Sequence, residues 1–109
     1  MYAILLMKAR LQQIEKRIAR IKSELVGLKV MRPGSLTRQY KDPKTQTGAY
    51  YQLSYTLDMR SRTEYIRQPW VSNIRRQVKR YKRYKQLNAE WVSLSIEHSK
   101  LTMKLEHMQ

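Results

Sequence analysis

A regular pattern of apolar side chains runs through the first thirty residues of the chain. Its members alternate between spacings of three and four: Ile4, Met7, Leu11, Ile14, Ile18, Ile21, Leu25 and Leu28. These are the a and d positions of a coiled coil, where one stripe of a helix faces a partner helix. The pattern predicts a helix from about residue 2 to residue 30, and Arg32, Pro33 and Gly34 end it.

A second stripe of the same kind closes the chain. Pro69 suits the first turn of a helix, and we expect this helix to run to about His107. Its stripe is regular over Tyr84, Leu87, Trp91, Leu94, His98, Leu101, Leu105 and Met108. The stretch before Tyr84 departs from the heptad spacing, so the first turns of this helix are predicted to lie outside the coiled coil.

The two stripes are equally long, and an antiparallel pairing of the helices satisfies both. In that register Arg17 meets Glu97 favourably and Arg10 meets Lys104 unfavourably. A parallel pairing of the first helix with its own copy is also favourable, and isoleucine at both a and d favours more than two helices. We therefore expect a homo-oligomer. The residues predicted to hold it together are Ile4, Leu11, Ile14, Ile18, Ile21 and Leu25.

The period of the pattern changes between the helices. Proline and glycine interrupt residues 33–49, which predicts a loop, with a short helical turn from Ser35 to Tyr40. Apolar and polar residues alternate from Tyr50 to Leu57, as in a strand, and Ser61 to Arg67 would form a second one. Asp58-Met59 between them lacks the usual hairpin-turn residues. A β-hairpin is nevertheless expected, packed on helices because two strands alone are marginally stable.

The predicted fold is mostly α with a small β-hairpin. It consists of an antiparallel pair of long helices, forming a coiled coil, with the β-hairpin inserted between them. At 109 residues the chain is one structural module. It divides into a coiled-coil helix (1–31), a loop plus β-hairpin (32–68) and a basic helix that continues into the coiled coil (69–109).

Composition narrows the function. The chain has 23 Lys and Arg against eight Asp and Glu, a net charge of +15, which is typical of proteins that bind a polyanion, nucleic acid above all. It has no cysteine, no paired-carboxylate motif and no glycine-rich phosphate loop. We therefore expect that the chain is not an enzyme and that it binds neither a metal nor a cofactor. The longest apolar run, Ala3 to Met7, is far shorter than the ~20 residues that span a bilayer. A cytoplasmic protein without a membrane partner is expected.

The densest charge lies in IRRQVKRYKRYKQL, residues 74–87, which contains no acidic residue. Its cations are Arg75, Arg76, Lys79, Arg80, Lys82, Arg83 and Lys85. Because the whole chain has only eight acids, most of this charge must stay unpaired, which favours contacts to phosphates over a merely solvated helix face. Charge reversal at Arg76, Arg80 and Arg83 is expected to abolish nucleic-acid binding.

A second basic set lies in the middle of the chain. It consists of Arg32, Arg38, Lys41, Lys44, Arg60, Arg62 and Arg67. Arg60 and Arg62 fall near the expected hairpin tip, from which a β-ribbon can enter a groove. The tyrosines Tyr40, Tyr50 and Tyr84 are candidates for stacking on bases, with a role in the core as the alternative.

The middle of the chain, over PGSLTRQY, GAYYQLS, EYIRQPWV and the basic segment, resembles a family of small bacterial and archaeal proteins of unknown function. Their RGSL-like and GPYYYLS-like elements match residues 32–95, and their genes lie near transposases and other mobile-element genes. Many relatives carry clustered cysteines where this chain has KDPKTQTG, Lys41 to Gly48, so a metal role does not carry over. The resemblance implies a mobile-DNA setting without an established activity.

Two functions from different classes follow. The first is a nucleic-acid-binding protein, DNA favoured over RNA, that oligomerises and acts as an accessory or architectural factor for a transposase or recombinase. The alternative is a coiled-coil structural adaptor that binds a partner protein without contacting nucleic acid.

Overall fold

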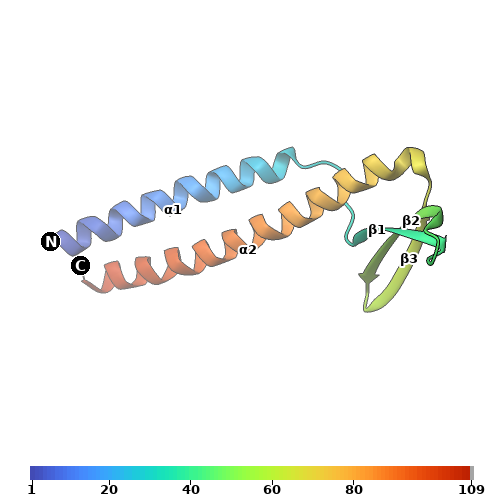
Figure 1. The fold of residues 1–109 in the computed structure, drawn as a ribbon. Helices are drawn as coiled ribbons and strands as arrows, with labels where there is room; N and C mark the ends of the chain where they lie inside the picture. Colours follow the sequence, from blue (N-terminus) through green and yellow to red (C-terminus); the bar gives the residue numbers. More distant parts are fainter. Residues whose placement is uncertain (109) are drawn as a thin grey trace. The chain divides into compact units, whose positions relative to one another are not determined.

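The computed structural model describes residues 1–108 of the chain as mostly helical, with a three-stranded antiparallel sheet between two helices (Figure 1). The elements are α1 (Tyr2–Gly27), β1 (Ser35–Asp42), β2 (Thr47–Leu57), β3 (Arg60–Ile66), the 3-10 helix η1 (Gln68–Trp70) and α2 (Val71–Met108). They form two compact units. The helical unit joins residues 1–28 to the part of α2 that begins at Tyr84, and the sheet unit is residues 29–83.

In the helical unit the predicted apolar stripe of α1 is the least exposed side of the helix. Ile14 and Ile21 have no exposed surface, and neither has Leu87 on α2. The other stripe residues of α1 are half-buried. The helix ends at Gly27, three residues before the predicted end, where Leu28 takes an extended conformation. The 3.6-residue period therefore located both helices correctly and their ends approximately.

Two ion pairs join the helices of this unit. Arg10 binds Glu97 through two hydrogen bonds of 2.6 and 2.9 Å, and Arg17 binds Glu90 through two of 2.6 and 2.7 Å. Residue numbers rise along α1 as they fall along α2, so the two segments run antiparallel, as Figure 1 also shows. The predicted charge pairing is wrong, since Arg17 pairs with Glu90 and not with Glu97. Both arginines reach carboxylates one heptad earlier on α2, where each pairing is favourable. The predicted alignment of Ile14 with His98 and of Ile21 with Trp91 agrees with the contacts of their neighbours, Glu15 with His98 and Lys22 with Trp91.

The sheet unit contains one strand more than predicted. β2 lies in the centre, with β1 and β3 antiparallel on either side. The predicted loop over 33–49 and the helical turn from Ser35 are wrong, because β1 begins at Ser35 and pairs along β2. Between the two strands, Asp42 Oδ1 accepts the backbone N–H of Lys44 at 3.1 Å and closes a tight turn. The edge of β2 supplies backbone partners that local sequence preference does not reveal.

The expected hairpin is present as β2 and β3. Its turn, Asp58-Met59, places both residues at positive φ, 52° and 63°. Positive φ at both central positions is the requirement of a type I′ turn, which matches the twist of the strands it connects. Asp tolerates this conformation better than most residues, while Met59 adopts it at a cost that the strand pairing offsets.

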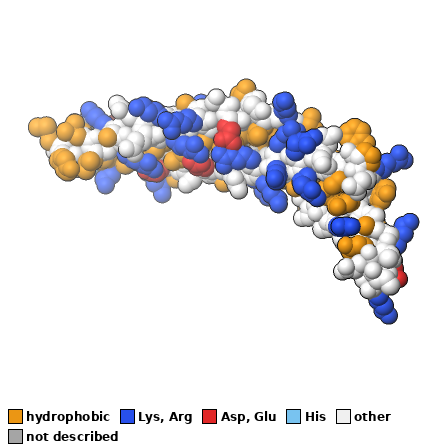
Figure 2. Space-filling model, turned by 45° about the horizontal axis from the view of Figure 1, so that its top comes forward, with side chains coloured by type: hydrophobic (Ala, Val, Ile, Leu, Met, Phe, Trp, Pro, Cys, Tyr) orange, Lys and Arg blue, Asp and Glu red, His pale blue; other side chains and the backbone are white. Residues whose placement is uncertain are grey.

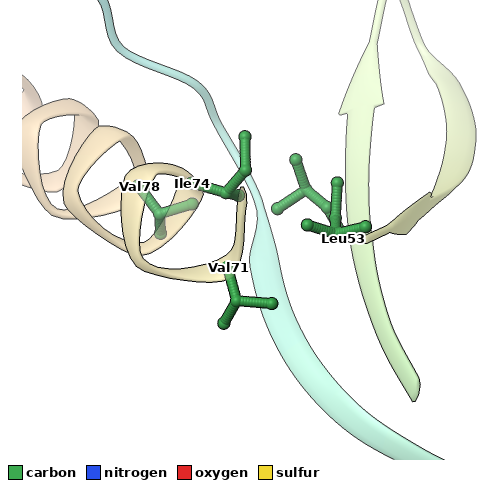
Figure 3. Packing of buried hydrophobic residues seen from close by; sticks show 5 residues of the cluster. Leu53, Val71, Ile74 and Val78 are labelled. Carbon is green, nitrogen blue, oxygen red and sulfur yellow. The ribbon is translucent and has the colours of Figure 1, made fainter. Parts of the chain in front are cut away.

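The core of the sheet unit lies between the sheet and the first turns of α2. Leu53 is fully buried at its centre and points toward Val71, Ile74 and Val78 of α2 (Figure 3). Ile66 of β3 completes the cluster, and Leu36, Tyr51 and Tyr55 pack partly against it. This packing fixes which side of the basic helix faces the sheet. Across residues 1–108, no helix is long and apolar enough to cross a membrane.

Candidate nucleic-acid interface

Positive charge is concentrated in the sheet unit. Residues 29–83 carry 14 of the 23 basic residues and three of the eight acidic residues, a net charge of +11. Figure 2 shows how Lys and Arg side chains outnumber acidic ones on one face of the molecule. Like charges at this density repel each other, and a bound polyanion would relieve that repulsion.

The part of α2 in the sheet unit has three distinct faces. Val71, Ile74 and Val78 form the first, which is buried against the sheet. A second face carries Arg75, Lys79 and Lys82, and a third carries Arg76, Arg80 and Arg83. Each basic face has the spacing i, i+4, i+7, which aligns side chains along one side of a helix. Only their surroundings distinguish the two basic faces.

The second face borders a cleft of about 300 Å³, which we call the basic cleft. It is lined by Ser35, Leu36, Arg75, Val78, Lys79 and Lys82. Leu36 and Val78 are the apolar residues of this lining, and the three cations bring positive charge to it. All three cations are exposed, and within residues 1–108 none of them has an ion-pair partner. The cleft therefore presents hydrogen-bond donors and positive charge to an anion.

The third face contributes to the fold. Arg80 is half-buried and donates from Nη1 to the backbone carbonyl of Val30 at 3.0 Å. The backbone N–H of Arg32 donates to the carbonyl of Gln77 at 3.2 Å, which fastens the same incoming segment to the same helix. Arg76 is exposed and donates to the side chain of Asn73. Arg80 thus anchors the chain between residue 28 and β1.

Arg32, a member of the second basic set, makes contacts within the sheet unit. It forms an ion pair with Glu64, and its guanidinium lies 5.2 Å from the ring centroid of Tyr55. The hydrogen bond from Arg32 lowers the pKa of Glu64 below its ordinary value. Glu64 lies across from Leu53 in the register and therefore points to the helix-facing side of the sheet.

The other sheet cations are spread over the unit. Arg38 lies on the helix-facing side of β1, and its guanidinium is 5.4 Å from the ring centroid of Tyr40. The ring of Tyr40 therefore already contacts a cation. Arg60 and Arg62 are exposed at the start of β3, and Lys44 is exposed in the β1–β2 turn. Lys41 and Tyr50 lie on the opposite side of the sheet from α2, while Arg67 is exposed just after β3. The structure thus brings only some of the predicted cations together.

A family model described as "Domain of unknown function (DUF6788)" matches residues 6–76. The chain belongs to this family. The match takes in most of α1, the three strands and the first turns of α2, and it ends inside the basic segment. No curated protein and no solved structure matches the chain. The DUF6788 description names neither an activity nor a genomic setting, so the mobile-element setting stays a prediction.

In this DUF6788 chain the residues predicted to hold an oligomer together lie on the inward stripe of α1. These are Ile4, Leu11, Ile14, Ile18, Ile21 and Leu25. Ile14 and Ile21 are already fully buried within a single chain. Tyr84 and Lys85 belong to the helical unit, where Tyr84 is 36% exposed. Self-association would therefore involve other surfaces or the exposed edges of this stripe.

Among residues 1–108, no three His, Cys, Asp or Glu side chains come together in a way that could hold a metal ion. His98 Nε2 lies 3.1 Å from Glu15 Oε1, an interaction between the two helices. The DUF6788 chain thus offers charged and aromatic surfaces as its candidate chemistry.

Proposed function

We propose that this chain is a non-enzymatic protein that binds nucleic acid, with DNA favoured over RNA. Its sheet unit would contact the phosphate backbone. The observation that carries the proposal is the basic cleft. Arg75, Lys79 and Lys82 project from a helix whose adjacent face is packed into a core, so the backbone that carries them is already ordered. Phosphate contacts position a protein on nucleic acid, and these side chains suit that role.

The spacing of the three cations fits a nucleic-acid strand. Arg75 and Lys82 are seven residues apart, which on an α-helix is a rise of about 10 Å. One strand of duplex DNA presents a phosphate every ~3.4 Å along the helix axis. The three cations therefore span about three successive phosphates. The cations of β3 and of the β1–β2 turn would add further contacts at a distance from the cleft.

We further propose that the helical unit is an antiparallel coiled coil that serves assembly in the cytoplasm. A homo-oligomer would present two or more basic clefts to one nucleic acid and raise its avidity without new contacts. The chain would then act as an accessory or architectural factor for a transposase or recombinase. That last step is supported by the resemblance of residues 32–95 to proteins encoded near mobile-element genes.

The cleft is tested by charge reversal. Fluorescence anisotropy with labelled duplex DNA compares the wild type with Arg75→Glu, Lys79→Glu and Lys82→Glu combined. The matched control combines Lys8→Glu, Lys16→Glu and Arg20→Glu, three exposed cations of α1 that change the net charge by the same amount. We expect the cleft variant to lose binding at least tenfold more than the control. Equal losses would show that net charge alone, and not the cleft, holds the nucleic acid.

Salt dependence supplies a second measurement. If about six residues contact phosphate, the logarithm of the affinity should fall with the logarithm of salt concentration at a slope of ~−5. The cleft variant should show a slope about three units shallower. Absence of any binding to duplex DNA, single strands and RNA at low salt would rule the proposal out.

An apolar groove on the helical unit could receive a second copy of the chain or, in the second candidate function of an adaptor, a different partner protein. The groove has a volume of about 480 Å³ and is lined by Trp91, Val92, Ser95, Ile96, Ser99, Lys100 and Met103. Val92, Ile96 and Met103 are 59%, 51% and 61% exposed, at the spacing of one helix face. Ser95 and Ser99 also border a neighbouring groove next to Ala19 of α1. Small side chains here would let another helix approach closely.

We assign this groove to a second copy of the chain. Two helices bury only one stripe each, and Ile14, Ile21 and Leu87 are the fully buried side chains of the described helical unit. So small a core is marginal alone, and pairing two units would cover Val92, Ile96 and Met103. Sedimentation equilibrium should find a dimer or higher oligomer that Ile96→Glu dissociates, while Lys100→Glu at the rim leaves it intact. A monomeric wild type would favour the adaptor function with a different protein partner.

A further inference from the structure

The side of the sheet turned away from α2 has an unusual composition. Successive side chains of a strand point to opposite sides of the sheet. Leu36, Leu53 and Ile66 face the helix, so their neighbours along each strand face the opposite side. We call that opposite side the outer face. Its central residues are Thr37, Gln39, Tyr50, Gln52, Thr63 and Tyr65. Each is exposed or half-buried, so this face is open to solvent.

Two tyrosines form the centre of the outer face. The rings of Tyr50 and Tyr65 have centroids 6.3 Å apart and planes inclined at 40°. This separation lies within the range of an interacting aromatic pair, so the rings make one continuous surface. Tyr65 is 66% exposed, and the core of the sheet unit does not use it. The pairing of β2 with β3 holds both rings in place, since Tyr65 lies directly across from Gln52.

Polar and positive groups surround the pair. Gln39 lies directly across from Tyr50, as Gln52 does from Tyr65, and each amide offers both donors and an acceptor. Lys41 is on the same face, with its side chain against Gly48. A Cβ built on Gly48 would lie 3.0 to 3.3 Å from three carbons of Lys41. The Lys41 stem therefore crosses the sheet toward the strand that carries Tyr50.

Acidic side chains are absent from the centre of this face. The acids of the sheet unit are Asp42, Asp58 and Glu64. Asp42 closes the β1–β2 turn, Asp58 lies in the β2–β3 turn, and Glu64 pairs with Arg32 on the helix-facing side. A negatively charged ligand thus meets rings, amides and the Lys41 ammonium there. That combination fits the bases and phosphates of a nucleic acid.

We propose that the outer face is a stacking platform for the bases of a single-stranded nucleic acid, centred on Tyr50 and Tyr65. The proposal rests on the proposed function and specifies its ligand. In a duplex the base faces are covered by neighbouring pairs, whereas in a single strand they are free to stack on an exposed ring. Gln39 and Gln52 are placed to bond the edges of the stacked bases.

β1 connects the platform to the basic cleft. Ser35 lines the cleft and Gln39 adjoins Tyr50 across the strand pair. Four residues of a strand span about 13 Å. The cleft and the tyrosines lie on opposite sides of the sheet, and β1 is the edge strand between them. A single strand that leaves the cleft could therefore pass around the β1 edge and reach the tyrosines within a few nucleotides. Duplex affinity should depend on the cleft alone, and single-strand affinity on the cleft and the platform together.

The test separates base contacts from phosphate contacts. The probes are a labelled 12-nucleotide oligothymidylate, a strand of the same length built of abasic units, oligouridylate, and a DNA duplex. The first two carry the same charge, but only one has bases. Wild-type protein should bind oligothymidylate at least tenfold more tightly than the abasic strand, because stacking contributes ~1–3 kcal/mol per base, about 5- to 150-fold.

The variants locate that preference on the outer face. Combined Tyr50→Ala and Tyr65→Ala should remove the preference for bases and leave the abasic strand and the duplex bound as before. Tyr65→Phe keeps the ring and should keep the preference. Tyr2→Ala, at an exposed tyrosine of α1 with 76% exposure, is the matched control and should change nothing. A comparable preference for oligouridylate would extend the platform to RNA.

The outcomes distinguish the two proposals. If wild-type protein binds the abasic strand and the base-bearing strand equally, the platform is overturned while the basic cleft stands. If it binds none of the probes at low salt, the proposed function fails with it. If the double variant keeps the base preference, the stacking site is elsewhere and the platform is wrong. The wild-type comparison needs no variant, so a folding defect in the double variant does not affect it.

Discussion

Arg80 donates a hydrogen bond from Nη1 to the backbone carbonyl of Val30, 3.0 Å away and fifty residues earlier in the chain. The bond ties the segment that follows α1 to the basic helix, next to the bond between Arg32 and Gln77. Arg75, less than two turns away, has no such partner among residues 1–108 and borders the basic cleft. The surroundings of these two arginines therefore differ: Arg80 anchors the chain, whereas Arg75 is available to a ligand of the basic cleft.

The first prediction separates these two arginines. Arg80→Ala should lower the free energy of unfolding by about 1 kcal/mol, because it leaves a backbone carbonyl without its charged donor. Arg75→Ala should change stability by less than about 0.5 kcal/mol, as is usual for an exposed side chain, and weaken nucleic-acid binding instead. Urea denaturation monitored by circular dichroism, together with anisotropy, measures both effects. A loss of stability on Arg75→Ala that equals that on Arg80→Ala would contradict the assignment.

The second prediction concerns acid. The hydrogen bond from Arg10 lowers the pKa of Glu97 below its ordinary value of 4.5. A carboxyl with a lowered folded-state pKa stabilises the fold above its unfolded pKa and stops doing so as pH falls through the folded value. Wild-type protein should therefore melt at a higher temperature than Glu97→Gln at pH 7. The gap should narrow as pH falls below 4.5.

The control for that measurement is Glu106→Gln, at an exposed carboxylate on the same helix that makes no ion pair within residues 1–108. Its melting temperature should follow that of the wild type over the whole pH range. A gap between wild type and Glu97→Gln that stays constant into acid would mean that the Arg10–Glu97 pair does not contribute through its charge.

The third prediction compares two glycines. Gly34 has a φ of +124°, and an added Cβ would lie 2.5 Å from the carbonyl oxygen of Ser54. Gly34→Ala should destabilise the sheet unit by about 1–3 kcal/mol, because the backbone is strained and the central strand cannot move away. Gly27 at the end of α1 meets nothing within 4 Å, and Gly27→Ala should stabilise the helix by about 0.5–1 kcal/mol. Thermal melts of both variants should shift in opposite directions.

The helices were the part of the fold most open to prediction. Their signal is local, because a 3.6-residue period in the sequence produces an apolar side whatever the partner is. The charge pairing beside the stripe was not predictable in the same way. Glu90 and Glu97 occupy the same heptad position one repeat apart, so Arg17 could reach either of them on sequence grounds. Only the sum of contacts in three dimensions selects Glu90.

Two of the three strands were predicted from the sequence and one was not. The alternation after Tyr50 identified β2 and β3, whereas β1 was mistaken for loop because Pro33, Gly34 and Pro43 flank it. Its formation depends on the free edge of β2, a partner that single-residue preferences do not represent. Tyr65 was not among the predicted stacking residues, although the sequence contained the signal. It adjoins Ile66 on a strand, so when Ile66 faces the core Tyr65 must face away.

The sequence by itself determined the net charge of +15, the two amphipathic helices and the concentration of cations without acids in the basic segment. It also determined that residues 75, 79 and 82 share one side of a helix and residues 76, 80 and 83 another. Tertiary structure decided which of these sides borders a cleft and which one anchors the chain. Helical period assigns residues to faces, but a face acquires its environment only from segments distant in sequence. Here those segments are β1 for Lys79 and the carbonyl of Val30 for Arg80.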